Sequence, residues 1–196
     1  MPLCGAKKPI NPIKPIKPMA KAEILKPFIQ SWEGGFVIDP HDRGGATNKG
    51  VTIGTFRSVY GKDRTVEELK AITDEQWLHI FKVYYWDRWR ADDISSQSVA
   101  NILVDWVWLS GPATIRRVQR ILGVAVDGVV GPKTIAALNG RDPQTVFNEI
   151  KQLRQTYINS IAVGTQARFR NGWTRRLAGI HFGWLVCADG NTIECL

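Results

Sequence analysis

Apolar side chains recur at helical spacing along most of the 196-residue chain. Between residues 21 and 32 they fall on one stripe, which predicts an amphipathic helix that Pro27 either kinks or begins. Residues 99–109 are nearly all apolar and predict a buried central helix that ends at Gly111-Pro112. Further helices are predicted over residues 113–123, 131–139 and 142–162.

Polar residues at the expected helix starts support these assignments. Thr65 to Glu68 and Thr73 to Gln76 both have the spacing of a capping box, in which each end of the motif bonds the backbone of the other. The second box opens an aromatic segment, residues 73–89, that predicts one long helix. Short strands are expected only around residues 36–54 and near the C-terminus. The chain is therefore predicted to be mainly α, with at most a small β element after the first helix.

One acidic residue lies where the first predicted helix ends. Glu33 falls on the last turn of the first predicted helix, and Gly34-Gly35 are expected to form a left-handed helix cap. The helix dipole places negative charge near Glu33, and its neighbours Trp32 and Phe36 are expected to exclude water. Both effects favour a protonated carboxyl group, which general-acid cleavage of a glycosidic bond requires.

Groups that could assist such an acid follow within about twenty residues. Asp39 and Asp42 are candidates to orient or activate a water molecule, and Thr47, Asn48 and Thr52 are candidates to hold that water or a sugar hydroxyl. Glycosidases generally need a second such function on the opposite face of the sugar. The same residue types also suit a simple turn, so spacing alone leaves both alternatives open.

The stretch EGGFVIDPHDRGGATNKGVT resembles the signature of family 108 of the glycoside hydrolases, the secretion-activator type N-acetylmuramidases with a lysozyme-like fold. That signature reads E-G-G-[YF], followed by D-P-x-D-x-G-G-x-T-x-x-G-[IV]-T. The matching positions are Glu33, Gly34, Gly35, Phe36, Asp39, Pro40, Asp42, Gly44, Gly45, Thr47, Gly50, Val51 and Thr52.

The resemblance implies a bilobed, lysozyme-like fold and a peptidoglycan-cleaving lysozyme whose catalytic acid is Glu33. The order of Glu33, Asp42 and Thr52 is also similar to that of phage-type lysozymes, which implies that Asp42 and Thr52 complete the catalytic set. The residues expected to contact substrate are Gly34, Gly35, Phe36, Asp39, Thr47 and Asn48.

The second half of the chain carries another set of motifs. VQRILGVAVDGVVGPKT resembles the core of peptidoglycan-binding modules, and FRNGWTRRL resembles a segment of the same family's predicted peptidoglycan domain. DGVVGPKT also suits a plain turn before a helix that starts with proline, so a purely structural role stays open. We expect a Lys/Pro-rich N-terminal arm over residues 1–20, a lysozyme-like catalytic region over 21–111, and a helical peptidoglycan-binding-like region over 112–196. This last region either stands apart or completes the same fold.

Charge is uneven along the chain, whose formal net charge is +8. Residues 1–26 hold six lysines against one glutamate, and residues 151–176 hold six basic residues and no acidic one. Such surfaces favour polyanions, and peptidoglycan is the partner that agrees with the motifs. No nucleic acid partner is expected, because no basic and aromatic recognition motif is present. No apolar stretch approaches the length of about 18 residues that predicts a membrane span.

Other kinds of chemistry find little support in the sequence. His41, His79 and His181 are far apart and no HExxH or CxxC motif occurs, so neither a metal nor another cofactor is expected. Cys187 and Cys195 could close a small loop in an oxidising compartment, but free thiols are the default expectation.

The N-terminal segment lacks the apolar core of a Sec signal. We therefore expect synthesis in the bacterial cytoplasm and action in the periplasm or cell wall after release by a holin or export by a specialised secretion system. A prophage lysis enzyme and a host secretion enzyme both agree with this expectation. The main alternative is a non-catalytic wall-binding or secretion-accessory protein on a lysozyme scaffold, against which an intact Glu33 argues.

Overall fold

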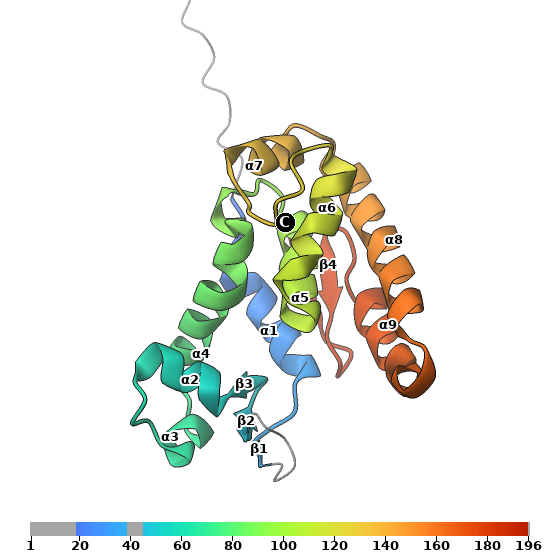
Figure 1. The fold of residues 1–196 in the computed structure, drawn as a ribbon. Coiled ribbons are helices and arrows are strands. Elements are labelled where there is room, and N and C mark those ends of the chain that lie inside the picture. Colours follow the sequence, from blue (N-terminus) through green and yellow to red (C-terminus); the bar gives the residue numbers. More distant parts are fainter. Residues whose placement is uncertain (1–18, 39–44, 196) are drawn as a thin grey trace, which may run out of the picture.

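The computed structural model describes residues 19–38 and 45–195 (Figure 1). Within these residues the fold has nine α-helices and two small antiparallel sheets. The helices are α1 (Ala22–Trp32), α2 (Ile53–Tyr60), α3 (Val66–Lys70), α4 (Asp74–Phe81), α5 (Gln97–Ser110), α6 (Ile115–Leu122), α7 (Pro132–Asn139), α8 (Pro143–Ile161) and α9 (Arg170–Ala178). The strands are β1 (Val37–Ile38), β2 (Ala46–Asn48), β3 (Val51–Thr52), β4 (Trp184–Val186) and β5 (Thr192–Glu194). The predicted mainly α fold with a small sheet after the first helix is confirmed.

The helices surround one shared interior. Figure 1 shows α2, α3 and the three-stranded sheet at one end of the molecule, α8 and α9 along the opposite side, and α1 between them. One cluster of buried apolar side chains includes members from α1 through β4. None of the described helices is both long enough and apolar enough to cross a bilayer. The predicted Lys/Pro-rich arm lies outside the described residues except for its last two positions.

Helix α5 is the most deeply buried helix among those described. Ile102, Leu103 and Val104 are fully buried, and the helix packs against α8 and against the aromatic segment that follows α4. Complete burial of one such side chain contributes about 1.5–3 kcal/mol, so α5 is a major source of stability. The helix ends at Gly111, where φ is 75°, as the sequence predicts.

Both predicted capping boxes form at the starts of α3 and α4. The prediction of one long helix over residues 73–89 is wrong, because α4 ends at Phe81 and continues as a π-helical turn, Lys82–Trp86, and then a 3-10 turn, Asp87–Trp89. A π turn brings residues five apart onto one face. Phe81 and Trp86 consequently meet with their ring centroids 6.3 Å apart. This change of winding directs Trp86 and Trp89 into the core together.

A tight hairpin joins β2 to β3. Its two turn residues, Lys49 and Gly50, have φ of 48° and 78°. Positive φ at both positions is typical of a type I′ turn, whose twist matches that of the flanking strands. Trp77 of α4 donates a hydrogen bond from Nε1 to the carbonyl of Lys49 at 2.9 Å. Asn48 donates from Nδ2 to two carbonyls at the end of α3, at 3.1 and 3.0 Å, so the hairpin is held by α3 and α4.

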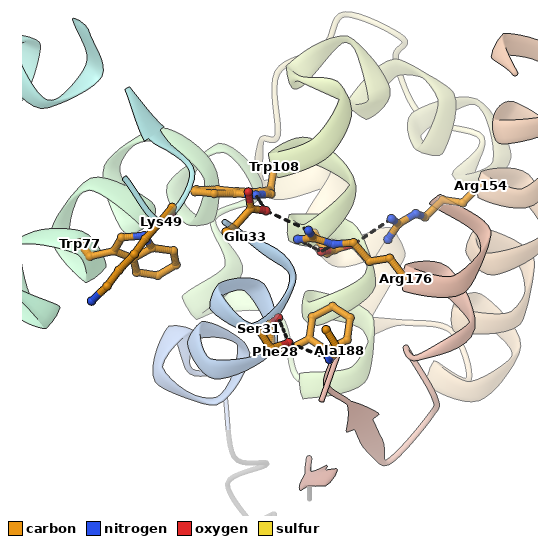
Figure 2. A network of polar contacts seen from close by, with 10 residues as sticks. Phe28, Ser31, Glu33, Lys49, Trp77, Trp108, Arg154, Arg176 and Ala188 are labelled. Atoms are coloured by element: carbon orange, nitrogen blue, oxygen red, sulfur yellow. Dashed lines mark hydrogen bonds and ion pairs between the residues drawn. The ribbon is translucent and has the colours of Figure 1, made fainter. Parts of the chain in front are cut away.

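The C-terminal hairpin of β4 and β5 is attached to α1. Ser31 accepts a hydrogen bond from the backbone N–H of Ala188 at 3.1 Å (Figure 2). Cys187 and Cys195 follow the two strands as buried, free thiols. Burial raises the pKa of Cys195 to about 11. Packing and hydrogen bonds, rather than a cross-link between these two cysteines, therefore hold this hairpin.

Candidate active site

Glu33 is the residue at which α1 ends. Its backbone is extended, with φ −94° and ψ 144°, and neither Gly34 nor Gly35 has a positive φ, so the predicted left-handed cap is wrong. The chain instead runs from the helix directly into β1, which requires an extended exit. A Cβ atom built on either glycine would meet no described atom within 4 Å. The two glycines therefore leave open space next to Glu33.

Two donors hold one carboxylate oxygen of Glu33 (Figure 2). Oε1 accepts hydrogen bonds from Nε1 of Trp108 at 2.7 Å and from Nη1 of Arg176 at 2.9 Å. The Glu33 side chain is 19% exposed, whereas that of Arg176 is 5% exposed. The carboxyl group is therefore fixed in orientation but still accessible from solvent.

The second oxygen of Glu33 lies against the hairpin turn. A Cβ atom on Gly50 would lie 2.9 Å from Oε2 of Glu33 and 2.5 Å from Cζ2 of Trp108. Gly50 also has a φ of 78°, which disfavours any other residue. Among the described residues, no hydrogen bond reaches Oε2. Glycine at this position thus brings the backbone close to the oxygen that has no other described partner.

Aromatic rings form the wall behind this carboxyl group. The Trp108 ring contacts those of Trp77, Phe81 and Tyr85, with centroids 5.6, 5.8 and 4.5 Å away. Burial, and then the negative charge of Glu33, raise the pKa of Tyr85. These contacts explain why α4 departs from regular helical winding after Phe81: the π turn brings Tyr85 and Trp86 to this side of the core.

Arg176 of α9 connects Glu33 to a buried ionic network. Its Nε and Nη2 donate to Oδ1 of Asp105 at 3.0 and 2.8 Å. Oδ2 of Asp105 accepts from Nη2 of Arg154 at 2.8 Å, and Nη1 of Arg154 donates to the carbonyl of Ile102. Burial alone would raise the pKa of Asp105, but the charges of Arg176 and Arg154 hold it below its ordinary value.

This network corrects one expectation about charge, and no motif in the sequence predicts it. The charge pattern predicts a basic surface over residues 151–176, but Arg154 and Arg176 are only 2% and 4% exposed. These two arginines form ion pairs with acidic residues inside the protein. Arg168, Arg170 and Arg175 remain exposed. The signal that could have revealed the network was Asp105, the single acidic residue of a largely apolar helix, because a buried carboxylate needs a cation.

Three predicted site residues, Thr47, Asn48 and Thr52, lie on the hairpin strands. Thr47 and Thr52 face each other across the β2–β3 register and are half-buried. Oγ1 of Thr52 accepts a hydrogen bond from the backbone N–H of Thr55 at 3.1 Å and thereby caps α2. The structure thus gives Thr52 a position at the start of α2 in addition to the catalytic role that the sequence predicts for it.

The remaining predicted site residues either make contacts within the fold or lie outside the described residues. Asn48 is 6% exposed and its Nδ2 is occupied by α3, so the fold itself accounts for this side chain. Phe36 is half-buried, and Nζ of Lys70 lies 5.4 Å from its ring centroid. Asp39 and Asp42 lie outside the described residues. Their predicted roles therefore stay predictions.

The DGVVGPKT motif builds a turn between α6 and α7. Gln119 donates to Oδ1 of Asp127 at 2.8 Å and accepts from the N–H of Gly128 at 2.8 Å. Asp127 also accepts from the N–H of Val129, and this bond is the main reason that its pKa is lowered. Gly128 has a φ of 82°, and a Cβ there would lie 2.9 Å from Cζ of Arg116. These motif residues therefore fix the turn between α6 and α7.

Comparison with known proteins agrees with both sets of motifs. The model of the glycosyl hydrolase 108 family matches residues 27–111, and that of a predicted peptidoglycan domain matches residues 113–178. Among solved structures, that of Brucella abortus SagA shares 33% sequence identity with a TM-score of 0.68, and the match covers 81% of this chain and 90% of that one. The comparison with curated proteins found no match. Glu33, its aromatic wall and the region that supplies Arg176 thus lie within matched segments, and the chain belongs to glycosyl hydrolase family 108.

Proposed function

We propose that this glycosyl hydrolase is a lysozyme-type N-acetylmuramidase that cleaves the glycan strand of peptidoglycan, with Glu33 as its general acid. The observation that carries the proposal is the asymmetric environment of the Glu33 carboxyl group. Oε1 is held by Trp108 and Arg176, whereas Oε2 lies at the hairpin turn with no other described partner. Oε2 is therefore the oxygen on which we place the transferable proton.

In this mechanism the proton on Oε2 passes to the glycosidic oxygen while the bond between that oxygen and the anomeric carbon breaks. The carboxylate that remains is stabilised by the two donors at Oε1. A water molecule attacks the anomeric carbon and gives its proton to the second carboxylate, which we propose is Asp42. We propose that Thr52 orients this water. None of these steps requires a metal or another cofactor.

The open backbone next to Glu33 supports a polymeric substrate. Gly34 and Gly35 are exposed, and a Cβ atom built on either would have no described atom within 4 Å, so a sugar ring can approach the main chain there. Phe36, Thr47, Asn48 and Asp39 are the further residues that we propose for this surface, on the basis of the sequence signature. We propose that the enzyme acts in the periplasm or cell wall after holin-type release or specialised secretion.

Glu33→Gln tests the assignment of the acid. The amide keeps an oxygen that Trp108 and Arg176 can bond, so the fold should persist, but it has no acidic proton. We expect cleavage of purified peptidoglycan to fall by about 100-fold or more, the usual scale for loss of a general acid. Products separated by chromatography and identified by mass spectrometry would show whether the new reducing ends are muramic acid.

The matched control is Glu23→Gln, which changes an exposed glutamate in the first turn of the same helix. This variant should retain wild-type activity within about twofold, because surface substitutions away from a site have small effects. Near-normal turnover by Glu33→Gln would remove Glu33 from the mechanism. A wild-type protein that binds sacculi but releases no fragments would instead favour the non-catalytic wall-binding alternative.

A further inference from the structure

An ionic network lies behind Glu33. Arg176 uses one guanidinium group to contact two carboxylates, with a single bond to Glu33 and two bonds to Asp105. The fork geometry of arginine permits this division, whereas a lysine ammonium could not hold both partners in the same way. Glu33 and Arg176 are separated by 143 positions in the sequence, so the contact depends on the complete fold.

The network joins two acidic residues, Glu33 and Asp105, to two basic ones, Arg154 and Arg176. The side chains of Asp105, Arg154 and Arg176 are almost completely buried. Asp105 is contacted by both arginines. It accepts two of the three bonds that Arg176 makes to the two carboxyl groups, so Asp105 fixes the guanidinium group that contacts Glu33.

We propose that Asp105 and Arg176 are positioning residues for Glu33: Asp105 fixes the guanidinium group of Arg176, and Arg176 in turn orients the carboxyl group of Glu33. This inference rests on the proposed function of Glu33 as a general acid. It assigns the peptidoglycan-domain half of the chain, which contains Arg176 and Arg154, a part in the chemistry beyond binding to the wall.

The other charged groups near Glu33 are few among the described residues. Tyr85, from the π turn, faces the carboxyl group, but its raised pKa keeps it neutral near pH 7. Lys49 belongs to the hairpin turn, but its Nζ lies 3.6 Å from Asp74, and Figure 2 shows its side chain directed away from Glu33. Trp108 donates a hydrogen bond and carries no charge. Arg176 is thus the described cation that contacts Glu33.

The proposal predicts that two substitutions slow the chemical step. Arg176→Met removes a donor that orients Oε1 of Glu33. Asp105→Asn removes the carboxylate that fixes the guanidinium group of Arg176. Both variants should therefore hold the Glu33 carboxyl group less firmly in its reactive orientation.

The variants are assayed for cleavage of a soluble glycan fragment of peptidoglycan. In both variants kcat should fall by about tenfold or more while KM changes less than about threefold, because orientation of Glu33 affects the chemical step more than substrate binding.

Arg170→Met is the matched control, because Arg170 is an exposed arginine of the same helix and its guanidinium group bonds Asn159 rather than Glu33 or Asp105. This variant should leave the rate unchanged. Arg176→Lys should recover less than half of the lost kcat, because the ammonium cannot bridge both carboxylates. Recovery of full activity by this variant would overturn the positioning role.

Breaking a buried ion pair is destabilising, so the folding of each variant is checked by circular dichroism before the kinetic assay. If Asp105→Asn does not fold, Asp105→Asn/Arg154→Met replaces it, because this double variant removes one acid and one base and leaves the net charge of the network unchanged. Its kcat should still fall, because Asp105 no longer fixes Arg176. A folded Arg176→Met or Asp105→Asn variant with the wild-type kcat would overturn the proposal. A wild-type protein that cleaves no glycan would instead contradict the proposed function.

Discussion

At the scale of single residues, Gly50 is the position where the hairpin turn, the Trp108 ring and the Glu33 carboxyl group meet. Gly50→Ala would place a methyl group 2.5 Å from the indole and 2.9 Å from Oε2, on a backbone with a φ of 78°. We expect a loss of about 1–3 kcal/mol in the free energy of unfolding, from the left-handed backbone and the crowding together. Activity should fall by at least about tenfold, because the carboxyl group must shift.

Gly172→Ala provides the comparison for this prediction. Gly172 lies in α9 and has no positive φ, and a Cβ atom built there would meet no described atom within 4 Å. Alanine there should raise the free energy of unfolding by about 0.5–1 kcal/mol, since it favours the helix. Urea unfolding of both variants measures the two effects. A Gly50→Ala variant as stable and active as the wild type would show that the turn tolerates a side chain.

Two single residues show which contacts a sequence can and cannot predict. The Glu33 corner could be found because the helical stripe, the acid and the two glycines are contiguous. Arg176 could not be found in the same way, since no local pattern tells a buried arginine from an exposed one. Only its partner Asp105, isolated among apolar residues of a central helix, carried a signal. The charge balance of the interior is a property of contacts between distant segments, and a single sequence does not display them.

At the scale of elements, the hairpin is held in place by Asn48. Its Nδ2 donates to two carbonyls at the end of α3. Asn48→Ala leaves these carbonyls without that donor in a buried position, which should cost about 1–3 kcal/mol in the free energy of unfolding. If Asn48 only supports the fold, KM for a soluble glycan fragment should change less than about twofold under conditions where the variant stays folded.

Asn171→Ala, an exposed change in α9, controls for the removal of an amide and should alter stability by less than about 0.5 kcal/mol. Thermal unfolding and steady-state kinetics separate the two roles of Asn48. A large rise in KM without a loss of stability would show that its amide contacts the substrate, as the family signature suggests. A loss of stability with an unchanged KM would confirm its place in the fold.

Elements were predicted well where local chemistry decides them. Thr65 and Thr73 begin their helices through capping boxes, and Gly111 ends α5, because each of these interactions joins residues close in sequence. The segment after Phe81 was not predicted, because its π turn follows from the packing of Tyr85 and Trp86 on distant side chains. The extended exit from α1 has the same kind of cause, since β1 pairs with β2 beyond the loop.

At the scale of the whole molecule, the two matched regions should unfold together. The buried cluster includes side chains from both, and Asp105 of α5 is bonded to Arg154 of α8 and Arg176 of α9. We expect one calorimetric transition in which the calorimetric and van't Hoff enthalpies agree. Two resolved transitions, one for each region, would show that the regions fold independently.

This transition should respond to acid in a defined direction. Because the pKa of Asp105 is lowered in the folded state, its stabilising effect is present above the pKa of an unfolded aspartate, about 3.9, and is lost as the pH falls through the lower folded value. The melting temperature should therefore decrease below about pH 4. Asp105→Asn/Arg154→Met, which lacks this buried acid, should lose less on the same acidification.

The contact between Arg176 of α9 and Glu33 limits where this chain can be recombined with a related one. On the sequence alone, the boundary between the two matched regions would be the natural crossover point. Here a crossover between residues 111 and 113 would separate Asp105 from both of its arginines. The chimera would inherit an uncompensated buried carboxylate, a defect of about 3–5 kcal/mol. A stable chimera would have to keep Arg154 of α8 and Arg176 of α9 together with Asp105. These two helices therefore have to be transferred with the region that matches the hydrolase family.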